Sequence, residues 1–361
     1  MNPKTNHPRR INSHVQTGDC DCDCACSIDK NGSVTQALPT IYSLELTPMC
    51  NNRCAGCSNV FFEDKARRKL PKIPQTFARW QEILQKIAPY ASKLKITGGE
   101  PTFHPDFEAI LHEIDRLEMV YTLFTNARWK NPSQTVDFLR TSHMFSGLLV
   151  SLHGATSEAH EAFTGVRGSF KQTLTNIKLA VNAGLLVNIS CVLTKQNAKQ
   201  IQDIVDLSKN LGASATVFNR YIGTTTNISL NPIELAQVIR TVDGFCHTEA
   251  VRFGTCIPLC FVESASTGCL AGTAYCTIDP WGNMRPCNHS PYVTGNILTG
   301  SLADAWHSDV MNKWRALTSN ECTSCSYFSK CRGGCKADAV LNDIERDPLM
   351  HAVFLPIVRN R

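Results

Sequence analysis

The chain has 361 residues, 43% of them hydrophobic, which is enough for one large domain and a smaller one. It holds no apolar run of about 18 residues and its start is polar and basic, so we expect neither a membrane-spanning helix nor a secretory signal. A net charge of +5 is mild for this length and argues against a nucleic-acid binder. We therefore expect a cytoplasmic protein that acts on neither membranes nor nucleic acids.

The 18 cysteines are the unusual part of the composition. They gather at 20–26, 50–57, 256–287 and 322–335, whereas Cys191 and Cys246 stand alone. A large chain without a secretory signal keeps its thiols reduced, so bound metal or clusters explain the count better than disulfides do. We expect the two lone cysteines to be structural.

Residues 1–37 show no sustained helical or strand period, so we expect a flexible tail. Cysteines alternate within it from Cys20 to Cys26, which would place four thiols on one side of an extended segment. An unpacked tail loses entropy when it binds a metal. We interpret this run as a site of adventitious metal binding.

Short apolar runs alternate with amphipathic stretches of helical length from Ile41 onward. The predicted strands are Ile41–Leu46, Leu94–Thr97, Val120–Thr125, Gly147–Leu152, Leu186–Leu193 and Ala215–Asn219. The predicted helices include Thr76–Ala88, Asp106–Arg116, Ser169–Ala183 and Ala198–Leu211. The alternation predicts parallel β/α units in an open sheet or an incomplete barrel, with chemistry at the carboxyl ends of the strands.

The periodicity fades after about Pro232, and Gly, Pro and Cys become dense from Cys256 onward. A small domain of this composition has a thin hydrophobic core. We expect bound metal to supply its cross-links.

Three cysteines directly follow the first predicted strand in the pattern C-x3-C-x2-C, at Cys50, Cys54 and Cys57. Three thiolates on one loop suit three irons of a four-iron cluster and leave the fourth iron open, as a catalyst requires. A three-cysteine zinc knuckle is the alternative. It needs a nearby fourth ligand, and no Cys or His follows before His104.

A second motif, Gly98-Gly99-Glu100-Pro101, directly follows the second predicted strand. Together the cysteine loop and this turn resemble the signature of the radical S-adenosylmethionine (radical SAM) superfamily. Further similarities lie at Thr125-Asn126, Ser151–Gly154, Gly165–Phe170 and Asn197. The resemblance implies an α/β fold with a partial (β/α)6 TIM-like barrel over residues 38–240.

The resemblance also implies roles for individual residues. Cys50, Cys54 and Cys57 would bind the catalytic four-iron cluster, whose open iron chelates the methionine part of S-adenosylmethionine (SAM). The residues assigned to SAM binding are Gly98, Gly99, Glu100, Pro101, Asn126, Ser151 and Arg167. The implied chemistry is reductive cleavage of SAM to methionine and a 5′-deoxyadenosyl radical, which abstracts a hydrogen atom from the substrate.

Two positions depart from the family pattern. Gly56 stands where an aromatic residue often precedes the third cysteine, and His153 stands where Asp is common. Neither change removes a cluster ligand. They affect the expected shape of the adenine side of the pocket and the contact of that loop with substrate.

The downstream cysteines resemble a SPASM domain, which binds auxiliary four-iron clusters in peptide-modifying radical SAM enzymes. The matching pattern is Cys269-x12-Gly282-x4-Cys287 followed by C-x2-C-x5-C-x3-C. A zinc ribbon is the alternative from spacing alone. The resemblance places this domain at 269–361, after a bridging region at 241–268. It assigns one auxiliary cluster to Cys269, Cys276, Cys287 and Cys335, and a second to Cys322, Cys325 and Cys331.

The last cysteine of the SPASM pattern is missing, because Met350 follows Asp347-Pro348-Leu349 where Cys is usual. The fourth ligand of the second auxiliary cluster is then His351 or Asp347, or comes from Cys256 or Cys260, or the iron is open. The sequence leaves these alternatives open and slightly favours an open or non-cysteine site.

The resemblance favours an enzyme that modifies a ribosomal peptide by cross-linking, oxidation or backbone excision. An anaerobic sulfatase-maturing type and a non-catalytic iron–sulfur scaffold or electron carrier are the alternatives. About 40 residues precede the first strand, too few for a leader-binding domain. We therefore expect a separate leader-peptide recognition protein, and an electron donor such as flavodoxin or ferredoxin.

Overall fold

A computed structural model describes the chain over residues 26–28, 34–58, 74–254, 257–262, 264–265 and 268–351. Most of the N-terminal cysteine run and Cys256 lie outside these ranges. Within them, no helix is long and apolar enough to cross a membrane.

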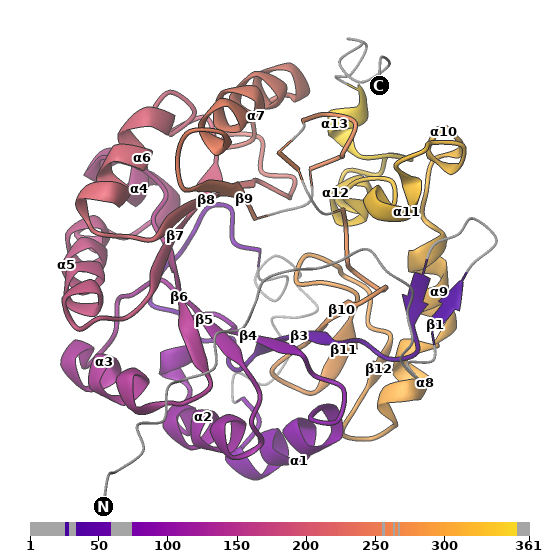
Figure 1. The fold of residues 1–361 in the computed structure, drawn as a ribbon, viewed down its shortest axis with the longest axis horizontal. Helices are drawn as coiled ribbons and strands as arrows, with labels where there is room; N and C mark the ends of the chain where they lie inside the picture. Colours follow the sequence, from indigo (N-terminus) through magenta and orange to yellow (C-terminus); the bar gives the residue numbers. More distant parts are fainter. Residues whose placement is uncertain are drawn as a thin grey trace, which may run out of the picture.

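One ten-stranded sheet runs through the molecule (Figure 1). In order across the sheet, its strands are β12 (Gly295–Asn296), β11 (Asn283–Arg285), β10 (Tyr275–Ile278), β3 (Ile41–Glu45), β4 (Lys93–Thr97), β5 (Tyr121–Thr125), β6 (Phe145–Ser151), β7 (Val187–Leu193), β8 (Ala215–Arg220) and β9 (Val251–Phe253). Strands from β10 through β3 to β9 pair in parallel, and β10 to β12 pair as antiparallel hairpins. A separate pair joins β1 (Cys26–Ile28) to β2 (Val34–Gln36).

Helices cover the outer face of the curved parallel strands, as in a partial barrel (Figure 1). They are α1 (Phe77–Ile87), α2 (Phe107–Arg116), α3 (Pro132–Thr141), α4 (Ser157–Thr164), α5 (Ser169–Asn182), α6 (Ile201–Asn210) and α7 (Pro232–Cys246). A short 3₁₀ helix, η2 (Pro101–Phe103), precedes α2. The C-terminal region adds α8 (Leu302–Trp306), α9 (Asp309–Ala316), α10 (Asn320–Thr323), α11 (Phe328–Cys331), α12 (Lys336–Leu341) and α13 (Pro348–His351). The alternating pattern thus confirms the predicted α/β partial barrel.

Two elements were not expected from the sequence. The periodicity was predicted to fade after Pro232, but α7 begins there, because Asn231 and Glu234 form a capping box and Pro232 occupies the first helical turn. Strand β9 lies in the stretch 241–268 and pairs with β8, extending the barrel by a seventh strand. At the other edge, β10 pairs with β3, so the cysteine-rich region continues the barrel sheet.

Candidate active site

The loop after β3 gathers the three cysteines of the first motif. Cys50, Cys54 and Cys57 are half-buried and line one large cavity at the carboxyl ends of the strands. Burial raises the pKa of the Cys54 thiol, and the neighbouring Cys57 and Cys50 thiols raise it further. Deprotonating three adjacent, half-buried thiols is costly without a cation. Bound iron supplies that charge, so this donor set fits a cluster held by three thiolates.

Hydrogen bonds to sulfur and to the backbone fix the shape of this loop. The Asn52 amide donates to Cys50 Sγ at 3.4 Å, and Asn126 Nδ2 lies 3.7 Å from the same sulfur. Asn126 Nδ2 also donates to Asn51 Oδ1 at 2.7 Å, and Arg128 Nη1 donates to the Asn51 carbonyl at 2.8 Å. Donors aimed at a ligating sulfur tune a cluster and orient its ligands.

The glycine turn after β4 packs directly against the start of the cysteine loop. The Gly99 amide donates to the Thr47 carbonyl and the Glu100 amide to the Met49 carbonyl, each at 2.7 Å. A Cβ at position 99 would lie 2.1 Å from Met49 O, and one at position 98 would lie 2.6 Å from Thr47 O. Both positions therefore require glycine. Gly98 and Gly99 also line the cavity, which is compatible with the SAM contact expected of them.

Glu100 and Pro101 lie behind this turn rather than on the cavity wall. The Glu100 carboxylate is fully buried and accepts hydrogen bonds from Thr102 Oγ1, Thr125 Oγ1 and the Asn126 amide, each at 2.8 Å. Burial raises the pKa of this carboxyl. In this structure its side chain ties the end of β4 to the end of β5. It thereby positions Asn126, which lines the cavity.

The end of β6 contributes Ser151 and His153 to the cavity wall. The His153 ring lies 4.1 Å from the Phe163 ring, and its Nδ1 accepts a hydrogen bond from the Val192 amide at 3.2 Å. Burial lowers the pKa of His153 to about 3, so the ring is neutral and carries its proton on Nε2. This position therefore offers a neutral donor where a carboxylate is common. Arg167, by contrast, is exposed between α4 and α5 and is not among the residues lining the cavity.

The cavity has a volume of about 1020 Å³. Inward-facing side chains of the barrel strands form its walls, among them Lys95 from β4 and Tyr275 from β10. The Lys95 ammonium lies 4.7 Å from the centre of the Tyr275 ring and 5.9 Å from that of Phe124. Sequence analysis did not single out Lys95, although the strand Lys-Leu-Lys-Ile-Thr places it on the inward face by alternation.

Three thiols of the cysteine-rich region line the same cavity: Cys269, Cys287 and Cys335. Cys287 and Cys335 both have Cys269 as an electrostatic neighbour. Cys276, the fourth ligand expected for this set, lies elsewhere. It follows the inward-facing Tyr275 on β10, so it points to the opposite face of the sheet, where it is fully buried beside Tyr42. We therefore correct its assignment from ligand to core residue.

Cys322, Cys325 and Cys331 form a second set on α10, α11 and the turn between them. They do not line the cavity. Within the described ranges, no three His, Cys, Asp or Glu side chains converge closely enough for one metal ion. A four-iron cluster separates its thiolates more widely than one ion does, because each sulfur binds a different iron.

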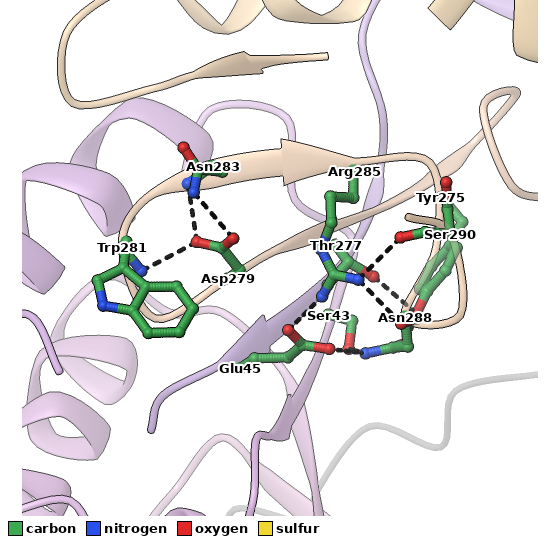
Figure 2. A network of polar contacts seen from close by, with 10 residues as sticks. All are labelled: Ser43, Glu45, Tyr275, Thr277, Asp279, Trp281, Asn283, Arg285, Asn288 and Ser290. Atoms are coloured by element: carbon green, nitrogen blue, oxygen red, sulfur yellow. Dashed lines mark hydrogen bonds and ion pairs between the residues drawn. The ribbon is translucent and has the colours of Figure 1, made fainter. Parts of the chain in front are cut away.

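A buried polar network joins the cysteine-rich region to the barrel (Figure 2). Arg285 on β11 forms an ion pair with Glu45 on β3, and Asn288 Nδ2 donates to the other Glu45 oxygen at 2.8 Å. Both charged side chains are almost fully buried. Arg285 Nη1 also donates to the Asn288 and Ser290 carbonyls, which shapes the turn that carries Cys287.

A second buried junction lies at the end of β8. Arg220 is fully buried and pairs with Asp347 at 2.8 Å and with Asp338 of α12 at 3.0 Å. Asp347 in turn accepts a hydrogen bond from the Cys335 amide at 2.7 Å. Arg220 thus ties the barrel to the segment that holds Cys335. Neither junction has a local signal in the sequence, because their partners lie more than 100 residues apart.

Comparisons with known proteins agree with this geometry. Residues 44–208 match the model of the radical SAM superfamily, and residues 269–335 match SPASM, an iron–sulfur cluster-binding domain. The AdoMet-dependent heme synthase of Methanosarcina barkeri is 26% identical, over 83% of this chain and 92% of that protein. The subtilosin biosynthesis protein AlbA of Bacillus subtilis is 27% identical, over 86% of this chain and 70% of that protein. The mycofactocin maturase MftC of Mycobacterium tuberculosis is 26% identical, over 83% of this chain and 78% of that protein.

Solved structures show the same fold. SuiB of Streptococcus suis bound to S-adenosylmethionine superposes with a TM-score of 0.71 at 21% identity, covering 87% of this chain and 78% of that one. The enzyme anSMEcpe with bound AdoMet and a peptide gives a TM-score of 0.70 at 18% identity, covering 87% of this chain and 94% of that one.

Proposed function

We propose that this chain, a radical SAM enzyme with a C-terminal SPASM iron–sulfur domain, modifies a ribosomally made peptide. When bound, SAM and the reduced cluster supply a 5′-deoxyadenosyl radical that abstracts hydrogen from unactivated positions. The chain's own residues bind and orient the reactants and exclude water. The nature of the substrate is the part that we propose.

One observation carries this proposal. The thiols of the first cysteine loop and those of Cys269, Cys287 and Cys335 line a single cavity. A substrate held between them is within reach of both iron–sulfur sites. That arrangement suits a substrate that loses a hydrogen atom on one side and an electron on the other.

The named relatives support a peptide as that substrate. AlbA is named for the biosynthesis of the bacteriocin subtilosin, and MftC is named a maturase. SuiB, which shares the fold, has been crystallised with its precursor peptide SuiA. A cavity of about 1020 Å³ is large enough for several residues of an extended peptide.

A heme precursor is the second candidate substrate. The heme synthase of M. barkeri aligns over 92% of its own length, a larger share than AlbA or MftC. The same cavity would then hold a porphyrin between the two thiol sets.

A deuterium-transfer assay tests both candidates. The anaerobically reconstituted chain is mixed with SAM, a reductant and a deuterated precursor peptide encoded beside its gene. Deuterium in 5′-deoxyadenosine together with a change in peptide mass supports the peptide proposal. An unchanged peptide and consumption of a heme-precursor porphyrin support the second candidate, and a Cys54→Ala variant should form no 5′-deoxyadenosine with either.

A further inference from the structure

We propose that Cys260 is the fourth cysteine ligand of the second auxiliary site, completing a set with Cys322, Cys325 and Cys331. It would replace the final cysteine of the SPASM pattern, where this chain has Met350. The inference rests on the iron–sulfur domain and not on the peptide proposed above.

The thiols of the region divide into two groups of neighbours. Burial raises the pKa of Cys260 to about 11, and the next contributions come from the Cys331, Cys325 and Cys322 thiols, in that order. The principal thiol neighbours of Cys260 are therefore those of the second set. Cys335 has Cys269 as its principal thiol neighbour instead.

Packing holds the segment around Cys260 in this place. Ile257, Phe261 and Val262 are nearly fully buried in the same apolar cluster as Leu349 of α13. The Phe261 amide also donates to the Pro258 carbonyl at 2.9 Å, which closes a turn around Cys260. The thiol is half-buried on a segment anchored from both sides.

Gly268 and Cys269 also contact the backbone of the second set. A Cβ at Gly268 would lie 2.3 Å from the carbonyl oxygens of both Lys330 and Cys331, so the two backbones are in contact. The Cys269 amide donates to the Cys331 carbonyl at 3.3 Å. Residues on each side of Cys260 thus pack against elements that carry the second set or lie next to it.

Two other side chains near this set fit the role less well. Met350 Sδ lies 4.0 Å from Cys322 Sγ, but a thioether cannot supply the negative charge of a thiolate. Both Asp347 oxygens are already engaged, one by Arg220 and the other by the Cys335 amide. Cys260 is the additional thiol that the described residues bring to this set.

Alkylation of the wild-type protein tests the inference without a substitution. Anaerobically reconstituted protein is treated with iodoacetamide before and after the iron is removed with a chelator, and labelling at each cysteine is measured by mass spectrometry. We expect Cys260 to be protected from alkylation in the iron-loaded protein, as Cys322, Cys325 and Cys331 are. Removing the iron should make all four cysteines reactive. Cys191, which is fully buried on β7 and has no thiol among its electrostatic contacts, is the control and should stay unlabelled in both states.

A matched pair of variants gives the second readout. In a Cys50/Cys54/Cys57→Ala background, only auxiliary iron remains. We expect Cys260→Ser to lower the iron content by up to about four per chain or to change the electron paramagnetic resonance (EPR) spectrum of one cluster, whereas Cys246→Ser should do neither. Labelling of Cys260 in the iron-loaded protein while Cys322, Cys325 and Cys331 stay protected would overturn the inference, and this result does not depend on how the variants fold.

Discussion

The cysteine loop at 50–57 and the cysteine-rich region after Gly268 both present thiols to the same cavity, but they are held there by different means. The first set lies within eight consecutive residues and is shaped by backbone hydrogen bonds to the turn at Gly98–Glu100. The thiols of the second region come from segments up to 66 residues apart, between Cys269 and Cys335. Buried ion pairs to the barrel fix that region, at Arg285–Glu45 and at Arg220.

The difference shows what each site depends on. A local loop needs small residues at the points of closest backbone approach, and a change there should leave distant parts intact. A site assembled from remote segments needs its long-range junctions, and losing one buried charge leaves its partners unpaired. The two regions should therefore fail independently.

Breaking the Arg220 junction is expected to have the largest effect. Arg220→Met removes the partner of two buried carboxylates, Asp338 and Asp347, and should lower the free energy of unfolding by about 3–5 kcal/mol. Urea unfolding followed by circular dichroism measures this. Arg79→Met, which breaks an exposed pair with Glu82, should cost no more than about 1 kcal/mol, and an equal loss in both variants would contradict the proposed dependence on buried pairs.

Adding one methyl group to the glycine turn should disable the first site selectively. In Gly99→Ala the new Cβ would collide with Met49 O at 2.1 Å, so the turn and the cysteine loop must move apart. We expect the rate of 5′-deoxyadenosine formation to fall by about 100-fold while the auxiliary iron is retained. Gly244→Ala on α7 is the control, because nothing lies within 4 Å of its Cβ and alanine should stabilise the helix by about 0.5–1 kcal/mol.

Lys95 lies in the cavity wall between the two regions, and replacing it should change the stability of the protein in a way that depends on pH. Burial lowers the pKa of Lys95 to about 8, so the folded protein gives up this proton more readily than the unfolded chain does. The penalty for burying the charge is complete below pH 8, shrinks as the pH rises from about 8 to about 10.5, and vanishes above that range.

Lys95→Met should consequently raise the free energy of unfolding by about 2 kcal/mol at pH 7, a value reduced because the amine borders an open cavity. The gain should disappear near pH 10.5. Urea unfolding at both pH values measures it. Lys93→Met, at an exposed position on the same strand, should change stability by less than about 0.5 kcal/mol at either pH.

Local patterns in the sequence predicted most of the barrel and the first site. Alternation and helical periodicity placed six strands within one or two residues at most ends, and cysteine spacing with the glycine turn identified the first loop. The capping box at Asn231 and Glu234 is a local signal for the start of α7, although the apolar periodicity that predicted the other helices is weak there.

Other features depend on the fold. The resemblance to a SPASM domain implied that Cys276 binds a cluster, but on β10 this residue pairs with Tyr42 of β3 and is fully buried on the face away from the cavity. The neighbours of Cys260 and the ion pairs of Glu45 and Arg220 are likewise set by segments that meet only in the folded chain. Residue type and local spacing carry no information about such contacts.

We expect SAM to react at the first cysteine loop and not at the auxiliary sites. EPR spectra of the reduced, reconstituted protein with and without SAM test it most directly. We predict that SAM changes the signal of one cluster in the wild type, and that a Cys50/Cys54/Cys57→Ala variant, which keeps its auxiliary clusters, shows no response to SAM. A SAM-dependent change that persists in that variant would contradict the claim.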